Sequence, residues 1–131
     1  MNGIRPSPAS MASRGTILVA DEERHSVQLI QQYLGHQGFR IETASDGREA
    51  LAKVARLRPT LMILDPLLPA MDGWEVCRRV RQQTTMPIIM LTACAGSGDS
   101  VLALNLGADD CVSKPFNLDF PDTREVRLAF L

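Results

Sequence analysis

Residues 61–81 read LMILDPLLPAMDGWEVCRRVR, and this stretch decides the fold. A run of four apolar residues ends at Asp65, and a loop rich in proline follows. A run that is apolar at every position is typical of a strand buried on both faces, as in a parallel sheet. From Trp74 to Gln82 the apolar residues recur at helical spacing instead. Strand, loop and helix in this order predict one βα unit of an α/β protein.

The same unit recurs along the chain. Other apolar, β-prone runs predict strands at residues 16–20, 39–43, 88–91 and 111–113. Helical periodicity and helix-end signals predict helices at residues 23–38, 50–57, 99–106 and 121–131. Strands that alternate with helices imply a parallel sheet with helices on both faces. The sequence therefore predicts one α/β domain, because 131 residues suit a single compact unit.

Composition and charge exclude several classes of protein. The net charge of −1 gives no overall basic surface for nucleic acid or for an anionic membrane. No apolar run approaches the roughly 18 residues of a membrane span. The three cysteines, Cys77, Cys94 and Cys111, form no C-x-x-C pair, which indicates a reducing compartment. We therefore expect a cytoplasmic protein that neither binds nucleic acid directly nor attaches to a membrane.

The first 15 residues differ in composition from the rest of the chain. Proline, serine and small residues predominate there, and the apolar centre of a secretory signal is missing. We expect residues 1–15 to be a disordered leader and residues 16–131 to form the domain.

Polar side chains follow four of the predicted strands directly. In sheets of this kind, ligands bind beyond the carboxyl ends of the strands, at a switch point in strand order. The residues that this rule gathers at one edge are Asp21, Glu22, Asp65, Thr92 and Lys114. The sequence thus predicts a crevice that holds three carboxylates, a hydroxyl and an ammonium group.

These groups suit phosphoryl chemistry on a carboxylate. Clustered carboxylates repel one another, and a hard cation relieves the repulsion. Mg²⁺ prefers oxygen ligands, keeps several waters and joins a few carboxylates to phosphate. A carboxylate such as Asp65 can act as a nucleophile and become an acyl phosphate. Mg²⁺ and Lys114 would then neutralise charge on the phosphoryl oxygens, and Thr92 would donate a hydrogen bond to one of them.

Four stretches together resemble the receiver domain of two-component response regulators. They are ILVADEE (17–23), the opening stretch (61–81), PIIMLTA (87–93) and GADDCVSKPFN (107–117). The resemblance extends from Thr16 to Leu118. It implies a flavodoxin-like, doubly wound (βα)5 three-layer sandwich with a five-stranded parallel sheet in the order 2-1-3-4-5.

The resemblance also implies a role for each residue of the crevice. Asp65 is expected to be the phosphoacceptor, Thr92 the switch hydroxyl, and Lys114 the cation that pairs with Asp65 and then with phosphate. The implied Mg²⁺ ligands are Asp21, Glu22, Asp65 and the backbone carbonyl of Leu67. Such a domain takes a phosphoryl group from a histidine kinase or a phosphotransfer protein and dephosphorylates itself. It is therefore a phosphorelay switch rather than an enzyme with a separate substrate.

The chain departs from the family's pattern near the expected switch. Cys111 stands where relatives carry Tyr or Phe, so the ring rotation that accompanies movement of Thr92 has no counterpart. Pro66 follows the phosphoacceptor and has no backbone N–H. Ala70 stands where glycine is common. We expect phosphoryl transfer to survive these changes and the relay from Thr92 and Cys111 to the surface to differ.

Two clusters of charge carry further expectations. A homodimer through the fourth helix, fifth strand and fifth helix is implied by the resemblance. Its candidate charged residues are Asp109, Asp110, Arg124 and Arg127. The arginines of the third helix, Arg78, Arg79 and Arg81, are instead expected to form a solvated face.

Two other functions fit parts of the sequence. An interaction module that signals without phosphorylation would account for Cys111 and Pro66. A Mg²⁺-dependent phosphohydrolase with an Asp nucleophile would need a second acid two residues after that nucleophile. Position 67 is Leu, which disfavours the phosphohydrolase.

Overall fold

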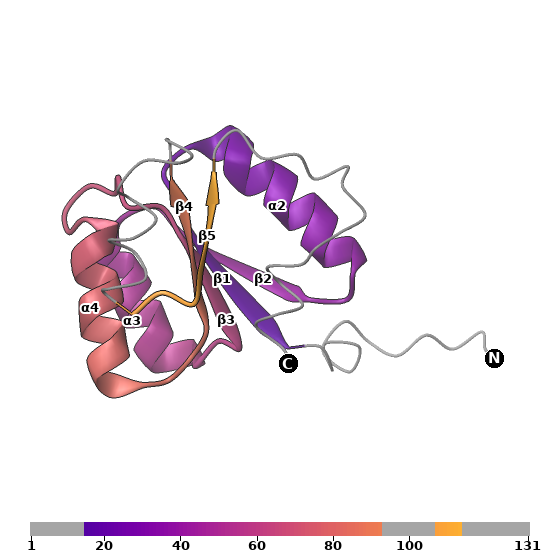
Figure 1. Cartoon of the computed structure of the whole chain (residues 1–131). Coiled ribbons are helices and arrows are strands. Elements are labelled where there is room, and N and C mark those ends of the chain that lie inside the picture. The colour runs from indigo at the N-terminus through magenta and orange to yellow at the C-terminus, as the bar shows by residue number, and fades with distance from the viewer. Residues whose placement is uncertain (1–14, 93–106, 114–131) are drawn as a thin grey trace.

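The computed structural model describes residues 15–92 and 107–113. Within them, neighbouring strands of one sheet all pair in parallel, in the order β2-β1-β3-β4-β5 (Figure 1). The strands are β1 (Thr16–Ala20), β2 (Arg40–Ala44), β3 (Leu61–Leu64), β4 (Ile88–Thr92) and β5 (Asp110–Ser113). The predicted α/β class with a parallel sheet is confirmed.

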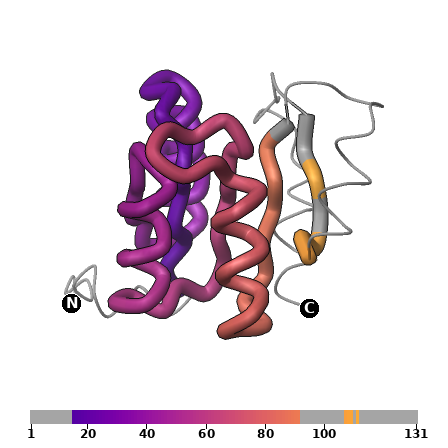
Figure 2. The backbone as a smooth tube through the Cα atoms, turned by 90° about the vertical axis from the view of Figure 1, so that its left-hand side faces the viewer, coloured from indigo at the N-terminus to yellow at the C-terminus, as the bar shows by residue number. Residues whose placement is uncertain are grey.

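Helices cover both faces of this sheet. Helix α2 (Arg24–His36) lies on one face, and α3 (Gly47–Leu57) and α4 (Gly73–Gln83) lie side by side on the other. Figure 2 looks onto the face that α3 and α4 cover. None of the three described helices is long and apolar enough to cross a membrane.

Alternate residues of the strands build two separate cores. In β1, Leu18 and Ala20 belong to the core under α3 and α4, whereas Ile17 and Val19 belong to the core under α2. Successive strand residues point to opposite faces of a sheet. The central strands β1 and β3 are covered on both faces and therefore carry apolar residues at nearly every position, which explains their unbroken runs in the sequence.

Three strands differ by one residue from their predicted bounds, and of these the fourth ends at Thr92 rather than at Leu91. The second strand runs from Arg40 to Ala44, because the N–H of Phe39 donates to the carbonyl of Leu34 (3.2 Å) and closes the end of α2. The fifth strand already begins at Asp110.

Three predicted segments lie wholly or mostly outside the described residues. Of the expected leader, only Gly15 is described, and its carbonyl accepts a hydrogen bond from the N–H of Arg40 (3.0 Å). The helices predicted at residues 99–106 and 121–131 are outside, so they stay predictions.

Arg81 corrects the expectation of a fully solvated arginine face. Its side chain is 23% exposed and pairs with Asp109 (Nη2 to Oδ2, 3.0 Å). The same guanidinium donates to the backbone carbonyls of Thr84 (3.2 Å), Met86 (2.7 Å) and Gly107 (2.8 Å).

Asp109 also accepts a hydrogen bond from the N–H of Ile88 (2.8 Å). Arg81 and Asp109 therefore join the end of α4 to the strands β4 and β5, while Arg78 and Arg79 are exposed as expected.

The first turn of α3 predicts a pH dependence of stability. Glu49 accepts a hydrogen bond from the N–H of Ser45 (2.8 Å) and pairs with Lys53 (3.2 Å). These contacts, the backbone hydrogen bond most of all, lower the pKa of Glu49 below its usual 4.5. A depressed folded-state pKa contributes stability above about pH 4.5 that is lost as the pH falls through the folded-state value. We expect Glu49→Gln to flatten the fall in the urea midpoint below that pH. Parallel pH profiles of the two proteins would contradict this.

Candidate functional site

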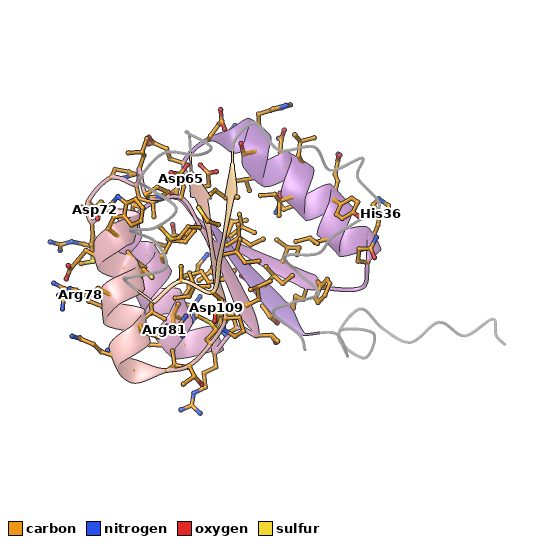
Figure 3. All side chains as sticks on the ribbon, in the orientation of Figure 1. His36, Asp65, Asp72, Arg78, Arg81 and Asp109 are labelled. Carbon is orange, nitrogen blue, oxygen red and sulfur yellow. The ribbon has the colours of Figure 1, made fainter. Side chains whose placement is uncertain are left out.

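Two acidic residues leave the sheet side by side at its carboxyl edge. Ala20 of β1 pairs with Leu64 of β3, so the residues that follow them, Asp21 and Asp65, leave adjacent strands at the same height. The N–H of Asp65 donates to the carbonyl of Ala20 (2.9 Å), which extends the β1–β3 ladder to the acid itself. Figure 3 shows Asp65 at this end of the sheet.

Both carboxylates are buried: Asp21 is 3% exposed and Asp65 8%. Each accepts a hydrogen bond from the backbone two residues later. Asp21 Oδ1 accepts from the N–H of Glu23 (2.9 Å), and Asp65 Oδ1 accepts from the N–H of Leu67 (2.7 Å). Such turns fix the orientation of the carboxylate. Two like charges buried at neighbouring strand ends repel each other, so this edge favours a bound cation.

The oxygen donors at this edge suit a hard cation. Asp21 and Asp65 supply carboxylates, and the backbone of Leu67 follows directly. Glu22 is exposed, and the described part of the chain holds no group of three His, Cys, Asp or Glu side chains placed to bind a metal. Mg²⁺ commonly uses one or two carboxylates and keeps several waters. The two buried carboxylates therefore fit Mg²⁺, and Glu22 lies beside rather than within this pair.

The ends of β4 and β5 carry the remaining candidates. Thr92 closes β4, two residues beyond Met90, which pairs with Leu64. Thr92 pairs with Ser113, the last residue of β5, and Lys114 comes next in the chain. The side chain of Thr92 and all of Lys114 lie outside the described residues. Their contacts with Asp65 therefore stay predictions.

Cys111 lies within β5, where it pairs with Met90 of β4. Its side chain is half-buried and packs against the core under α3 and α4. Cys77 of α4 is fully buried in the same core, and this burial raises the pKa of its thiol. The compact side chain of Cys111 offers no ring to rotate, so its role in the switch stays a prediction.

The loop that follows Asp65, residues 66–72, is anchored to the body of the domain. Leu68 is buried in the core under α3 and α4, whereas Leu67 is 69% exposed. The N–H of Gly73 donates to the carbonyl of Pro66 (2.8 Å). The burial of Leu68 in the core fixes the orientation of the loop, so that Leu67 points outward beside Asp65.

A contact from α3 to this loop escaped the sequence reasoning. The N–H of Gly47 donates to the carbonyl of Pro69 (3.1 Å). The available signal was a repeated pattern, since Asp-Gly-x-Glu occurs at residues 46–49 and again at 72–75.

Ala70 holds the loop in a strained conformation. Its φ of 68° lies in the left-handed region, which costs an L-residue about 1–2 kcal/mol. Ala70→Gly removes this cost but adds freedom to the unfolded chain worth about 0.4–1 kcal/mol. We expect a net gain of about 0.5 kcal/mol in the free energy of unfolding, measured with urea.

The same substitution at Ala52, an exposed position of α3, is the matched control. Ala52→Gly should lose about 1 kcal/mol, because glycine is unfavourable inside a helix. Equal losses at the two positions would show that Ala70 carries no strain.

The sequence of the chain matches a known family and its members. Residues 17–120 match the family model of the response regulator receiver domain. The chain is 51% identical over 102 residues to the alkaline phosphatase synthesis transcriptional regulatory protein PhoP of Bacillus subtilis (strain 168), covering 77% of this chain and 42% of PhoP. It is 40% identical over 115 residues to the probable transcriptional regulator ycf27 of Cyanophora paradoxa, covering 88% and 47%. The chain thus spans less than half the length of these relatives.

Solved structures show the same similarity. A two-component response regulator from Clostridium difficile superposes with a TM-score of 0.81 at 30% identity, over 88% of this chain and 94% of that one. The BeF3-activated N-terminal receiver domain of RstA from Klebsiella pneumoniae superposes with a TM-score of 0.78 at 30% identity, over 88% and 96%.

Proposed function

The chain belongs to the response regulator receiver domain family, and from this membership we propose that it is the phosphoacceptor switch of a two-component phosphorelay. The observation that carries the proposal is the pair of buried carboxylates, Asp21 and Asp65, at the ends of adjacent strands. Buried acids without a cation are unfavourable. A site of this kind is therefore suited to bring a cation and a phosphoryl group together.

Asp65 is the proposed nucleophile. One of its carboxylate oxygens attacks the phosphorus of a phosphohistidine on a histidine kinase or a phosphotransfer protein. A P–O bond forms as the P–N bond breaks, and the leaving imidazole takes up a proton. The hydrogen bond from the Leu67 N–H (2.7 Å) holds the rotation of the carboxylate during the attack. Thr92 and Lys114 are proposed to contact the phosphoryl oxygens.

The acyl phosphate on Asp65 is then proposed to be hydrolysed. Water attacks the phosphorus, inorganic phosphate leaves, and the carboxylate is restored. The chain modifies only itself in this cycle, so we assign it as a switch rather than an enzyme with its own substrate.

Mg²⁺ is the proposed cofactor. Asp21, Asp65 and the Leu67 carbonyl would hold the ion, and Glu22 would act through a bound water. When bound, the ion neutralises charge on the transferring phosphoryl group.

The proposal extends to the rest of the receiver domain. We propose a complete (βα)5 arrangement with helices at residues 99–106 and 121–131, a cytoplasmic location, and a homodimer through these helices and β5. The two curated relatives are named as a transcriptional regulatory protein (PhoP) and a probable transcriptional regulator (ycf27), and each is more than twice as long as its matched part. The function proposed for this chain is that of the receiver alone.

Intact mass spectrometry tests the proposal. Incubation with acetyl phosphate and Mg²⁺ is expected to add the mass of one phosphoryl group, and EDTA in place of Mg²⁺ is expected to slow this gain at least about tenfold. No gain with Mg²⁺ would reject the switch and leave an interaction module of the same fold. Repeated turnover of an unrelated phosphomonoester would instead favour a phosphohydrolase.

A further inference from the structure

The helices α3 and α4 begin in the same way. Each starts with Asp-Gly-x-Glu, at residues 46–49 and 72–75, and in each the glycine is the first helical residue. The N-cap carboxylates of Asp46 and Asp72 accept hydrogen bonds from the N–H of the glutamate three residues later (2.8 and 2.9 Å). The first N–H of a helix has no partner inside that helix. Each glycine N–H is therefore available to an acceptor outside its helix, and the capped first turn fixes the direction in which it points.

Both glycine N–H groups bind the same loop. Gly73 donates to the carbonyl of Pro66 (2.8 Å), and Gly47 donates to the carbonyl of Pro69 (3.1 Å). The two contacts bracket Leu67 and Leu68 in the sequence. The segment that follows Asp65 is thus held at both ends by helix N-termini, whose partial positive charge strengthens hydrogen bonds to carbonyl oxygens.

Neither glycine can carry a side chain unless this loop moves. A Cβ on Gly47 would lie 2.7 Å from the carbonyl carbon of Met71 and closer still to its oxygen. A Cβ on Gly73 would lie 2.6 Å from the Cα of Pro66 and closer still to the carbonyl oxygen of Asp65. The obstructing atoms belong to the backbone, so a change of rotamer cannot relieve the overlap.

We propose that Gly47 and Gly73 are positioning residues for phosphoryl transfer, which hold residues 66–71 so that the Asp65 carboxylate and the Leu67 carbonyl are set for the incoming group. This inference rests on the proposed function. Gly47 is the informative member, because it lies on α3 and touches the loop only beyond Leu68. Its effect on Asp65 must pass through the loop backbone.

The test compares Gly47→Ala with Gly35→Ala. Gly35 lies in α2, and a Cβ there meets nothing within 4 Å, so the chemical change is identical without the overlap. With acetyl phosphate and saturating Mg²⁺, we expect Gly47→Ala to slow phosphorylation by about tenfold to a hundredfold, because small misplacements of reacting groups are costly. Gly35→Ala should stay within roughly twofold. Amide hydrogen exchange should speed up at Leu67, Leu68 and Gly73 in Gly47→Ala alone.

A gentler pair of variants covers the case in which Gly47→Ala does not fold. Asp46→Ala removes the cap that orients the Gly47 N–H without any steric overlap, whereas Asp46→Asn keeps a good cap. Phosphorylation should slow by roughly threefold in Asp46→Ala and be restored in Asp46→Asn. Faster exchange of the loop with an unchanged phosphorylation rate would overturn the inference while the proposed function stands. If the unaltered chain accepts no phosphoryl group, the proposed function itself fails, and the exchange rates still show whether the glycines hold the loop.

Discussion

Asp65→Asn is expected to remove phosphoryl uptake from acetyl phosphate, by at least about a hundredfold, because an amide is not a nucleophile toward phosphorus. Asp65 is also buried beside Asp21, so the substitution is expected to change the stability of the domain as well. Neutralising one of two neighbouring buried acids relieves their repulsion. The variant should therefore unfold at the same or a higher urea concentration, with a gain of up to about 1 kcal/mol. Loss of chemistry without loss of stability identifies a functional carboxylate.

The control for Asp65→Asn is Glu42→Gln. Glu42 lies in β2, pairs with Arg40 (3.5 Å) and is partly exposed, so it undergoes the same carboxylate-to-amide change away from the site. Its phosphorylation should match that of the unaltered chain. Full phosphorylation of Asp65→Asn would mean that another residue accepts the group, and peptide mapping of the product would show which one.

Arg81→Met is expected to cost about 2–4 kcal/mol of unfolding free energy. Methionine keeps the apolar stem of the side chain but leaves three backbone carbonyls and Asp109 without their shared donor. Removing one partner from partly buried hydrogen bonds costs more than the bonds themselves contribute. Asp109 is 53% exposed, so solvent screens part of its charge, and the carbonyls account for most of the loss. Urea denaturation measures the difference.

Arg79→Met is the matched control on the same helix. Arg79 is exposed and pairs with Glu75 (2.7 Å). Arg78 and Arg79 hold the pKa of Glu75 down at about 2, chiefly through the hydrogen bond from Arg78. Exposed pairs of this kind contribute little to stability, so the urea midpoint should hardly move. Equal losses in Arg81→Met and Arg79→Met would show that the Arg81 contacts do not stabilise the domain. The rate of phosphorylation of Asp65 should stay unchanged in Arg81→Met and in Arg79→Met. Arg81 and Asp109 lie away from the end of the sheet that carries Asp65 (Figure 3).

The sequence by itself determined the strands, the three described helices and the edge of the sheet at which Asp21 and Asp65 lie. Unbroken apolar runs such as 61–64 specify strands that are buried on both faces, and helical spacing specifies what covers them. Asp21 and Asp65 could be placed together without coordinates, because residues that follow parallel strands share one edge of the sheet. This information is local, because each strand or helix can be predicted from the residues of its own segment alone.

Only the tertiary structure decided which of these residues are buried and which distant backbones meet. It buried Asp21 and left its neighbour Glu22 exposed. This difference in exposure depends on the path of the backbone between β1 and α2. It turned Arg81 from an expected surface charge into the link between α4 and β5. It also brought Gly47 against the loop that begins 19 positions later at Pro66. Such contacts join segments far apart in the chain, and no periodicity within one segment records the partner that packing will supply.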